Sequence, residues 1–216
     1  MTAFDYQEYN TEQVLGKRFY NLGSVIYPSI TTVLGNTLPV GDEAWLDAWK
    51  ARVGLEEAAR KSKAATDRGT NVHTMLERFV RGDDPLVAEF PPEHARVFSS
   101  MKLEARKINK TYGQEVVLYS NVFEIAGRCD HIGEWQGEPA IIDYKTSSKP
   151  KAEADIQDYW LQTAFYALAH NEMFGTNITR LVILMGVEKS LPLVFKSKVT
   201  DQMIESLALR TEQFYN

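Results

Sequence analysis

Three strand-like segments follow one another closely in the middle of the chain, and this run constrains the fold most strongly. They are EVVLYS (115–120), VFEIAGRCDHIGEW (122–135) and EPAIIDYK (138–145). Apolar and β-branched residues recur in each segment, as they do in half-buried strands. Gln136-Gly137 supplies a tight turn, so the last two segments should pair as a hairpin. The chain must therefore build a sheet around this hairpin.

Helix-like segments stand on both sides of these strands. An apolar stripe through Val72, Leu76, Phe79 and Val80 is typical of an amphipathic helix, and Gly82 ends it. The expected elements are a helix over 56–80 with a potential break at Arg68-Gly69, a helix from Pro92 to Tyr112 closed by Gly113, the three strands, a helix over 155–173, strands over 179–188 and near 191–197, and a helix from Thr200. This order predicts an α/β fold, with a central mixed sheet flanked by helices.

The first 65 residues look like an extension of helices and loops, and residues 66–216 form the core domain. In YPSITTVLG (27–35), Ser29 and Thr31 stand where a helix could be capped. The stretch WLDAWKARVG (45–54) predicts a short amphipathic helix that ends at Gly54. The extension is too long to be a simple connector between elements.

Composition excludes several classes of protein. No apolar stretch approaches the roughly 20 residues that a membrane-spanning helix needs, so no membrane partner is expected. The first residues, MTAFDYQEYN, resemble neither a secretory signal nor a transit peptide, and we expect a cytoplasmic protein of a bacterium or a phage-infected cell. The single cysteine, Cys129, excludes a disulfide framework and a cysteine-ligated zinc or iron–sulfur site. A net charge of −5 argues against indiscriminate nucleic-acid binding but allows a local basic channel.

The strand that ends in Asp143 and Lys145 carries an acid and a base on one face, because strand side chains alternate with a period of two. The hairpin would bring Asp130 of GRCD to nearly the same height as Asp143 on the neighbouring strand. Two adjacent carboxylates repel each other unless a cation lies between them or one is protonated. Hard oxygen ligands suit Mg²⁺ or Mn²⁺. The alternatives are a solvated strand face for Asp143 and Lys145, and a plain strand end for Asp130.

Two pairs of residues on the helices add to this pattern. His73 and Glu77 lie one helical turn apart, with Gly69 a further turn back, so they share a face. Gln162 and Tyr166 have the same spacing and would donate hydrogen bonds to a phosphate or base near the metal. The alternatives are a core histidine for His73 and an ordinary amphipathic helix for Gln162 and Tyr166.

In this order, the motifs GTNVH, GRCD, DYK and QTAFY resemble the PD-(D/E)XK nuclease superfamily in its RecB-like branch. The resemblance spans residues 66 to 187 and implies a restriction-endonuclease-like core. With YPSITTVLG upstream, the stretch from Gly127 to Lys151 is most similar to the mitochondrial genome maintenance exonucleases and their phage relatives, which act on single-stranded DNA. The four cysteines of iron–sulfur members and a Walker A loop are both absent from the sequence.

The resemblance implies a role for each residue at the site. Asp130, Asp143, His73 and the backbone carbonyl of Tyr144 would bind Mg²⁺ or Mn²⁺, and Lys145 would orient or help deprotonate the attacking water. Glu77 and Glu115 are secondary candidates, with a structural role favoured for Glu115. The candidates for contact with DNA are Gln162, Tyr166, Arg68, Arg128, Ser29 and Thr31, the basic stretches 60–63 and 149–151, and the aromatic rings of Tyr144, Tyr159 and Trp160.

The sequence thus predicts a metal-dependent DNA exonuclease that prefers single strands with a free end and serves replication, repair or recombination. The extension over 1–65 would help to enclose a passage that admits one strand of DNA. The alternative is that it only packs against the sheet and stabilises the fold. A RecB-like endonuclease or a nuclease that resects double-strand ends is the alternative within the enzyme class. A catalytically silent protein of nuclease fold, which binds DNA or a protein partner, is the alternative of another class.

Overall fold

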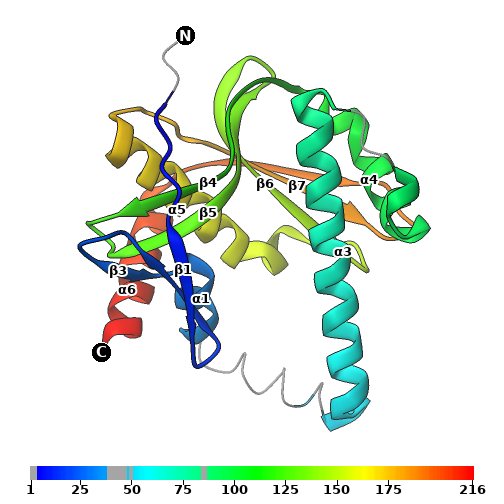
Figure 1. The fold of residues 1–216 in the computed structure, drawn as a ribbon, viewed down its shortest axis with the longest axis horizontal. Coiled ribbons are helices and arrows are strands. Elements are labelled where there is room, and N and C mark those ends of the chain that lie inside the picture. The colour runs from blue at the N-terminus through cyan, green and yellow to red at the C-terminus, as the bar shows by residue number, and fades with distance from the viewer. Residues whose placement is uncertain (1–3, 38–47, 49–50, 84–86) are drawn as a thin grey trace.

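A computed structural model describes residues 4–37, 48, 51–83 and 87–216 (Figure 1). Residues 45–47 and 49–50 of the predicted helix over 45–54, with Trp45 and Trp49, lie outside the described residues, whereas Ala48 and residues 51–53 are helical and Gly54 follows them as predicted. The helices are α1 (Ile30–Asn36), α3 (Leu55–Arg81), α4 (Pro92–Ala105), α5 (Gln157–Phe174) and α6 (Asp201–Tyr215), with short 3₁₀ turns η1 (Val87–Glu89) and η2 (Glu153–Ile156). The strands are β1 (Asn10–Val14), β2 (Lys17–Asn21), β3 (Ile26–Pro28), β4 (Ile108–Ser120), β5 (Ile125–Trp135), β6 (Glu138–Ser147), β7 (Arg180–Val187) and β8 (Leu193–Lys198).

The central sheet has the order β4-β5-β6-β7-β8. The three strands β4 to β6 form an antiparallel meander, and Gln136 and Gly137 make the predicted turn, both with positive φ. Helix α5 then carries the chain over to β7, which pairs parallel to β6, and β8 returns antiparallel. The sheet is therefore mixed, as the sequence predicts.

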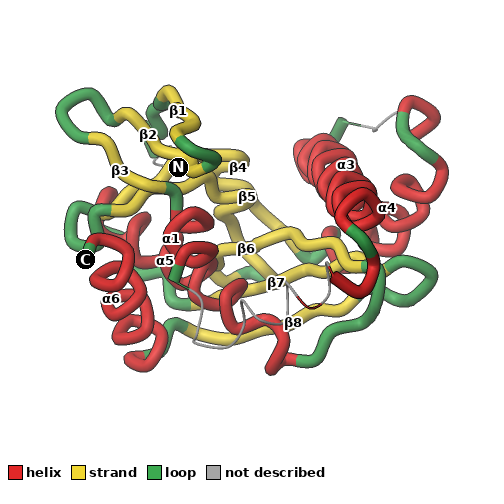
Figure 2. Tube along the Cα trace, turned by 90° about the horizontal axis from the view of Figure 1, so that it is seen from below, coloured by secondary structure: helices red, strands yellow, loops and turns green. Residues whose placement is uncertain are grey.

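Helices cover both faces of this sheet (Figure 2). On one face, residues of α1, α5 and α6 pack against Ile141 and Ile183. On the other face, residues of α3 and α4 pack against Ile142 and Val182. Strands β6 and β7 are buried on both sides, which explains their nearly continuous apolar runs. The predicted α/β class with a flanked mixed sheet is confirmed.

Two predicted helix boundaries differ from the structure. The helix expected from Pro92 to Tyr112 ends at Ala105, and the residues from Ile108 onward form the first part of β4. Pairing of this segment with β5, which starts opposite Trp135, outweighs its local helical character. Helix α3 is continuous through Arg68-Gly69, where we expected a break, and Gly82 ends it in the left-handed conformation as predicted.

The N-terminal part contains a three-stranded sheet, β1-β2-β3, that the sequence did not predict, besides the expected helix α1. Ser29 caps α1, because its hydroxyl accepts a hydrogen bond from the Thr32 amide at 3.0 Å. Tyr20 and Tyr27 of the small sheet pack on Val117 and Ala126 of the central sheet. Within the described part of the chain, no helix has both the length and the apolar character needed to cross a membrane.

Candidate metal centre

The hairpin of β5 and β6 opens at Asp130. Its regular pairing ends at His131 and Ile142, whereas β6 stays paired with β7 as far as Ser147. The next positions beyond the last pair are Asp130 and Asp143, as the predicted hairpin with its turn at Gln136-Gly137 requires. The Tyr144 amide donates to the Asp130 carboxylate at 2.8 Å, so a side chain replaces the backbone partner that β5 no longer provides. This bond fixes the Asp130 carboxylate where the two strands separate.

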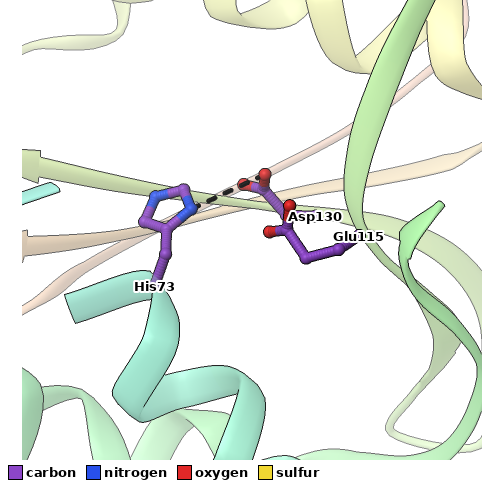
Figure 3. A group of neighbouring side chains, drawn as sticks. All are labelled: His73, Glu115 and Asp130. Carbon is purple, nitrogen blue, oxygen red and sulfur yellow. Dashed lines mark ion pairs between the residues drawn. The ribbon is translucent and has the colours of Figure 1, made fainter. Parts of the chain in front are cut away.

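Three side chains from three different elements meet at this opening (Figure 3). They are His73 of α3, Glu115 of β4 and Asp130 of β5, and one ligand atom of each lies within 4.8 Å of the other two. His73 Nδ1 is 3.6 Å from Asp130 Oδ1. Figure 3 shows the imidazole and the two carboxylates pointing toward one another. One imidazole nitrogen with carboxylate oxygens is a ligand set that suits Mn²⁺ or Mg²⁺.

Glu115 takes a more central place than the sequence suggested. It is one of the few non-glycine residues with positive φ, at 53°. The register sets it opposite Asp130, between the pairs Gln114–His131 and Val116–Cys129. Burial, followed by the nearby charge of Asp130, raises the pKa of Glu115 to about 7. Two carboxylates held together against their mutual repulsion are an arrangement that a bound cation would stabilise.

Asp143 and Lys145 form a buried ion pair beside this cluster. Asp143 is only 1% exposed, and apart from the Lys145 ammonium none of the described residues donates to its carboxylate oxygens. Burial raises the pKa of Asp143 despite the opposing charge of Lys145. For Lys145, burial favours the neutral amine, but the carboxylates of Asp143 and Asp130 outweigh it and raise the pKa. Asp143 itself is not a member of the three-residue group around His73.

A cavity of about 450 Å³ opens next to the cluster, lined by Gly69, Thr70, His73, Thr74, Glu77 and Glu115. A Cβ atom on Gly69 would lie 3.9 Å from the Thr146 hydroxyl oxygen, which is an ordinary contact distance. The packing of α3 on β6 therefore does not require glycine, and the missing side chain keeps the cavity open. Glu77 lines the same cavity and forms an ion pair with Arg81.

Both arginines predicted to contact phosphate are engaged within the protein. Arg68 is buried and forms an ion pair with Glu188 just beyond β7. Arg128 donates to the backbone carbonyl of Glu115 and, at 3.1 Å, to the carboxylate of Glu8. Their proposed contacts with DNA would have to compete with these bonds.

Gln162 and Tyr166 are joined by a hydrogen bond, from the Gln162 amide to the Tyr166 hydroxyl at 3.1 Å. Tyr166 is 2% exposed, so its ring belongs to the core, while Gln162 is half-buried. A Cβ atom on Gly127 would lie 2.8 Å from a carbon of the Tyr166 ring. The glycine of the GRCD motif is therefore needed to admit this ring.

The other residues predicted to contact DNA differ in their exposure to solvent. Ser29 is buried and occupied as the helix cap, whereas Thr31 is exposed. Tyr144 and Trp160 are buried, whereas Tyr159 is half-buried, and two ammonium groups lie over its ring. Arg60, Lys61 and Lys63 of the first basic stretch all form ion pairs with acids on their own helix.

Comparison with known proteins gives a family match over more than half of the chain. The model of the PD-(D/E)XK nuclease superfamily matches residues 88–212, which include Glu115, Asp130, Asp143 and Lys145 but not His73. Mitochondrial genome maintenance exonuclease 1 of Xenopus tropicalis is 26% identical over 172 residues, which cover 76% of this chain and 50% of that protein. The protein of the same name from Mus musculus is 26% identical over 172 residues, covering 76% of this chain and 51% of that one.

The chain spans about half the length of these two curated relatives. Among solved structures, a candidate exonuclease from Eubacterium rectale aligns with a TM-score of 0.45 and 14% identity, over 68% of this chain and 66% of that one. The family resemblance read from the sequence motifs is confirmed by the family match.

Proposed function

Because the chain belongs to the PD-(D/E)XK nuclease superfamily, we propose that it hydrolyses DNA phosphodiester bonds with the help of a divalent cation. The observation that carries this proposal is the meeting of His73, Glu115 and Asp130 at the point where β5 leaves β6, beside the buried pair Asp143 and Lys145. We propose further that it acts as an exonuclease on single strands, in replication, repair or recombination. The names of its relatives, both called mitochondrial genome maintenance exonuclease 1, support the proposed exonuclease activity.

The residues present fit a bound Mg²⁺ or Mn²⁺. The three ligand atoms of the cluster are oxygens or an imidazole nitrogen, and the buried carboxylate of Asp143 lies close by, with the Lys145 ammonium as its partner among the described residues. His73, Glu115 and Asp130 would hold the cation, and Asp143 and the Tyr144 carbonyl are the further ligands that the family resemblance implies. When bound, the cation would polarise the scissile phosphate and make a coordinated water more acidic.

Asp130, Asp143 and Lys145 each have a further role beside the cation. Asp130 accepts the Tyr144 amide, which holds the start of the open segment of β6 in a fixed place. Asp143 holds the Lys145 ammonium by a buried ion pair, so the ammonium group is fixed in place before substrate binds. A fixed ammonium offsets the negative charge that builds up on the phosphate during attack. The product would carry a 5′-phosphate, as the family resemblance implies.

Lys151 is the best candidate in the basic stretches for guiding the DNA backbone. Its ammonium lies 5.0 Å from the centroid of the Tyr159 ring, and the Lys145 ammonium lies 5.1 Å from the same centroid. The two ammonium groups are therefore at most about 10 Å apart. The Lys151 ammonium donates to the Tyr159 hydroxyl at 3.3 Å and forms no ion pair with a carboxylate of the described residues, so its charge is available to a phosphate near the reacting one.

Lys151→Ala is expected to weaken binding of single-stranded DNA several-fold and to lower the dependence of binding on salt by about one counterion. Fluorescence anisotropy with a labelled oligonucleotide in EDTA would measure both quantities without cleavage. Lys61→Ala is the matched control, because Glu57 already lies 3.6 Å from the Lys61 ammonium. Equal effects of the two variants would remove Lys151 from the proposed DNA path.

The proposed preference for single strands rests on the size of the site. The cavity beside the cluster, of about 450 Å³, is in the range of sites that take a small molecule. It is large enough to accept one unpaired nucleotide. The N-terminal extension, whose small sheet packs on β4 and β5, would help to enclose the strand.

Digestion of matched DNA substrates tests this function. With Mg²⁺, end-labelled linear single strands should be degraded, closed circular single strands of the same sequence should persist, and blunt duplexes should be cut slowly. With EDTA, all three should remain intact. Rapid nicking of the circle would favour the endonuclease alternative. Tight DNA binding without any metal-dependent cleavage would favour the catalytically silent alternative.

A further inference from the structure

Arg128 connects the N-terminal segment to the candidate metal centre. It lies on β5, paired with Val117 of β4. One terminal nitrogen of its guanidinium donates to the backbone carbonyl of Glu115, and the other donates to the Glu8 carboxylate at 3.1 Å. A single side chain thus binds the backbone of a cluster residue and an acid more than a hundred positions away in sequence.

The backbone of Glu115 is in a conformation that requires such support. Its φ of 53° lies in the left-handed region, which residues with a Cβ atom adopt rarely. The pairing of β4 with β5 also shifts register shortly before it, between Thr111 and Gly113. From this conformation the Glu115 carboxylate meets Asp130, which lies opposite it in the register, and His73.

The residues around Glu8 are themselves anchored along the shifted part of β4. Tyr6 packs so closely on Gly113 that a Cβ atom there would lie 2.6 Å from the tyrosine ring. The Tyr6 hydroxyl is hydrogen-bonded to His170 of α5, at 3.0 Å from Nε2. Phe4 makes an edge-to-face contact with the same histidine ring, with 4.8 Å between the ring centroids. Glu8 therefore approaches Arg128 from a segment that is packed in place.

We propose that Arg128 is a positioning residue for the metal centre: it holds Glu115 in its left-handed conformation, and Glu8 holds Arg128. This inference rests on the proposed function, because it concerns the ligand set for the divalent cation. It gives Arg128 a different task from the phosphate contact that the sequence motif suggested. Loss of a residue that orients a metal ligand typically weakens metal binding about 10- to 100-fold.

The test compares metal binding with DNA binding in the same variants. In Arg128→Ala, calorimetric titration without DNA should show at least about tenfold weaker Mn²⁺ binding. The affinity for single-stranded DNA in EDTA should stay within about twofold of the wild type. Arg180→Ala is the matched control, since Arg180 also donates to a backbone carbonyl, that of Trp135, and pairs with an acid, Glu138, at the far end of the hairpin. It should leave Mn²⁺ affinity unchanged.

A milder variant guards against loss of the fold. Glu8→Gln changes an exposed side chain and should weaken Mn²⁺ binding by a few-fold, without a change in the circular dichroism spectrum. Unchanged Mn²⁺ affinity in Arg128→Ala, combined with weaker DNA binding in EDTA, would overturn the inference and restore the phosphate-contact role. Failure of the wild type to bind Mn²⁺ would instead overturn the proposed function itself.

Discussion

Lys145→Ala is expected to lower the rate of phosphodiester cleavage by about 10²- to 10³-fold, the usual effect of removing one fixed group that stabilises charge in a transition state. The Lys145 side chain is largely buried, and the carboxylates of Asp143 and Asp130 keep it protonated by raising its pKa. Its charge acts on the reacting phosphate more than on the bound strand. The affinity for DNA should therefore change little.

Single-turnover cleavage of a labelled linear oligonucleotide, with binding measured separately in EDTA, would distinguish these effects. Lys198→Ala is a suitable control, because it removes an exposed lysine from β8, the edge strand of the central sheet, whereas Lys145 lies on the central strand β6. Lys145→Arg should restore only part of the rate, since a planar guanidinium does not match a compact ammonium in a buried ion pair. Cleavage by Lys145→Ala at the wild-type rate would exclude this role.

Asp130→Asn is expected to abolish metal-dependent cleavage, by about 10³-fold or more, if the cation supplies several kcal/mol of transition-state stabilisation. Asparagine keeps the shape of the side chain and an oxygen that accepts the Tyr144 amide, so the fold should persist. Asp143→Asn should have a similar effect, because it also removes the partner of Lys145. Binding of DNA should persist or strengthen in both variants, since a negative charge beside the phosphate is lost.

The positions of Asp130, Asp143 and Lys145 could be predicted because they follow from local rules. The turn at Gln136 and Gly137 sets the register of the hairpin, and counting back from it brings Asp130 and Asp143 to matching positions. The period of two then gives Asp143 and Lys145 one face. These rules need only neighbouring residues, which a single sequence supplies.

The place of Glu115 could not be predicted in this way. Its backbone takes a left-handed turn, and Arg128 binds its carbonyl, at a position that the register of β4 and β5 sets opposite Asp130. Both depend on contacts between segments distant in sequence, including Glu8. No periodicity in the segment 115–120 encodes them, so the sequence favoured a structural role for Glu115.

Two other differences have the same origin. The segment from Ile108 to Tyr112 could continue a helix by its local character, but it pairs with β5 and becomes strand. The small sheet β1-β2-β3 was missed because β1 is exposed along its whole length, so it lacks the alternation of apolar and polar residues by which a strand is recognised. Long-range pairing decided both outcomes.

Direct titration of metal into the protein, without DNA, tests the central claim that His73, Glu115 and Asp130 form a cation site. Calorimetry at neutral pH with Mn²⁺ would compare the wild type with Asp130→Asn, after circular dichroism has established that both are folded. We predict saturable binding by the wild type and binding weaker by at least about tenfold in the variant. Equal affinity in the two proteins, or no binding by the wild type, would contradict the claim.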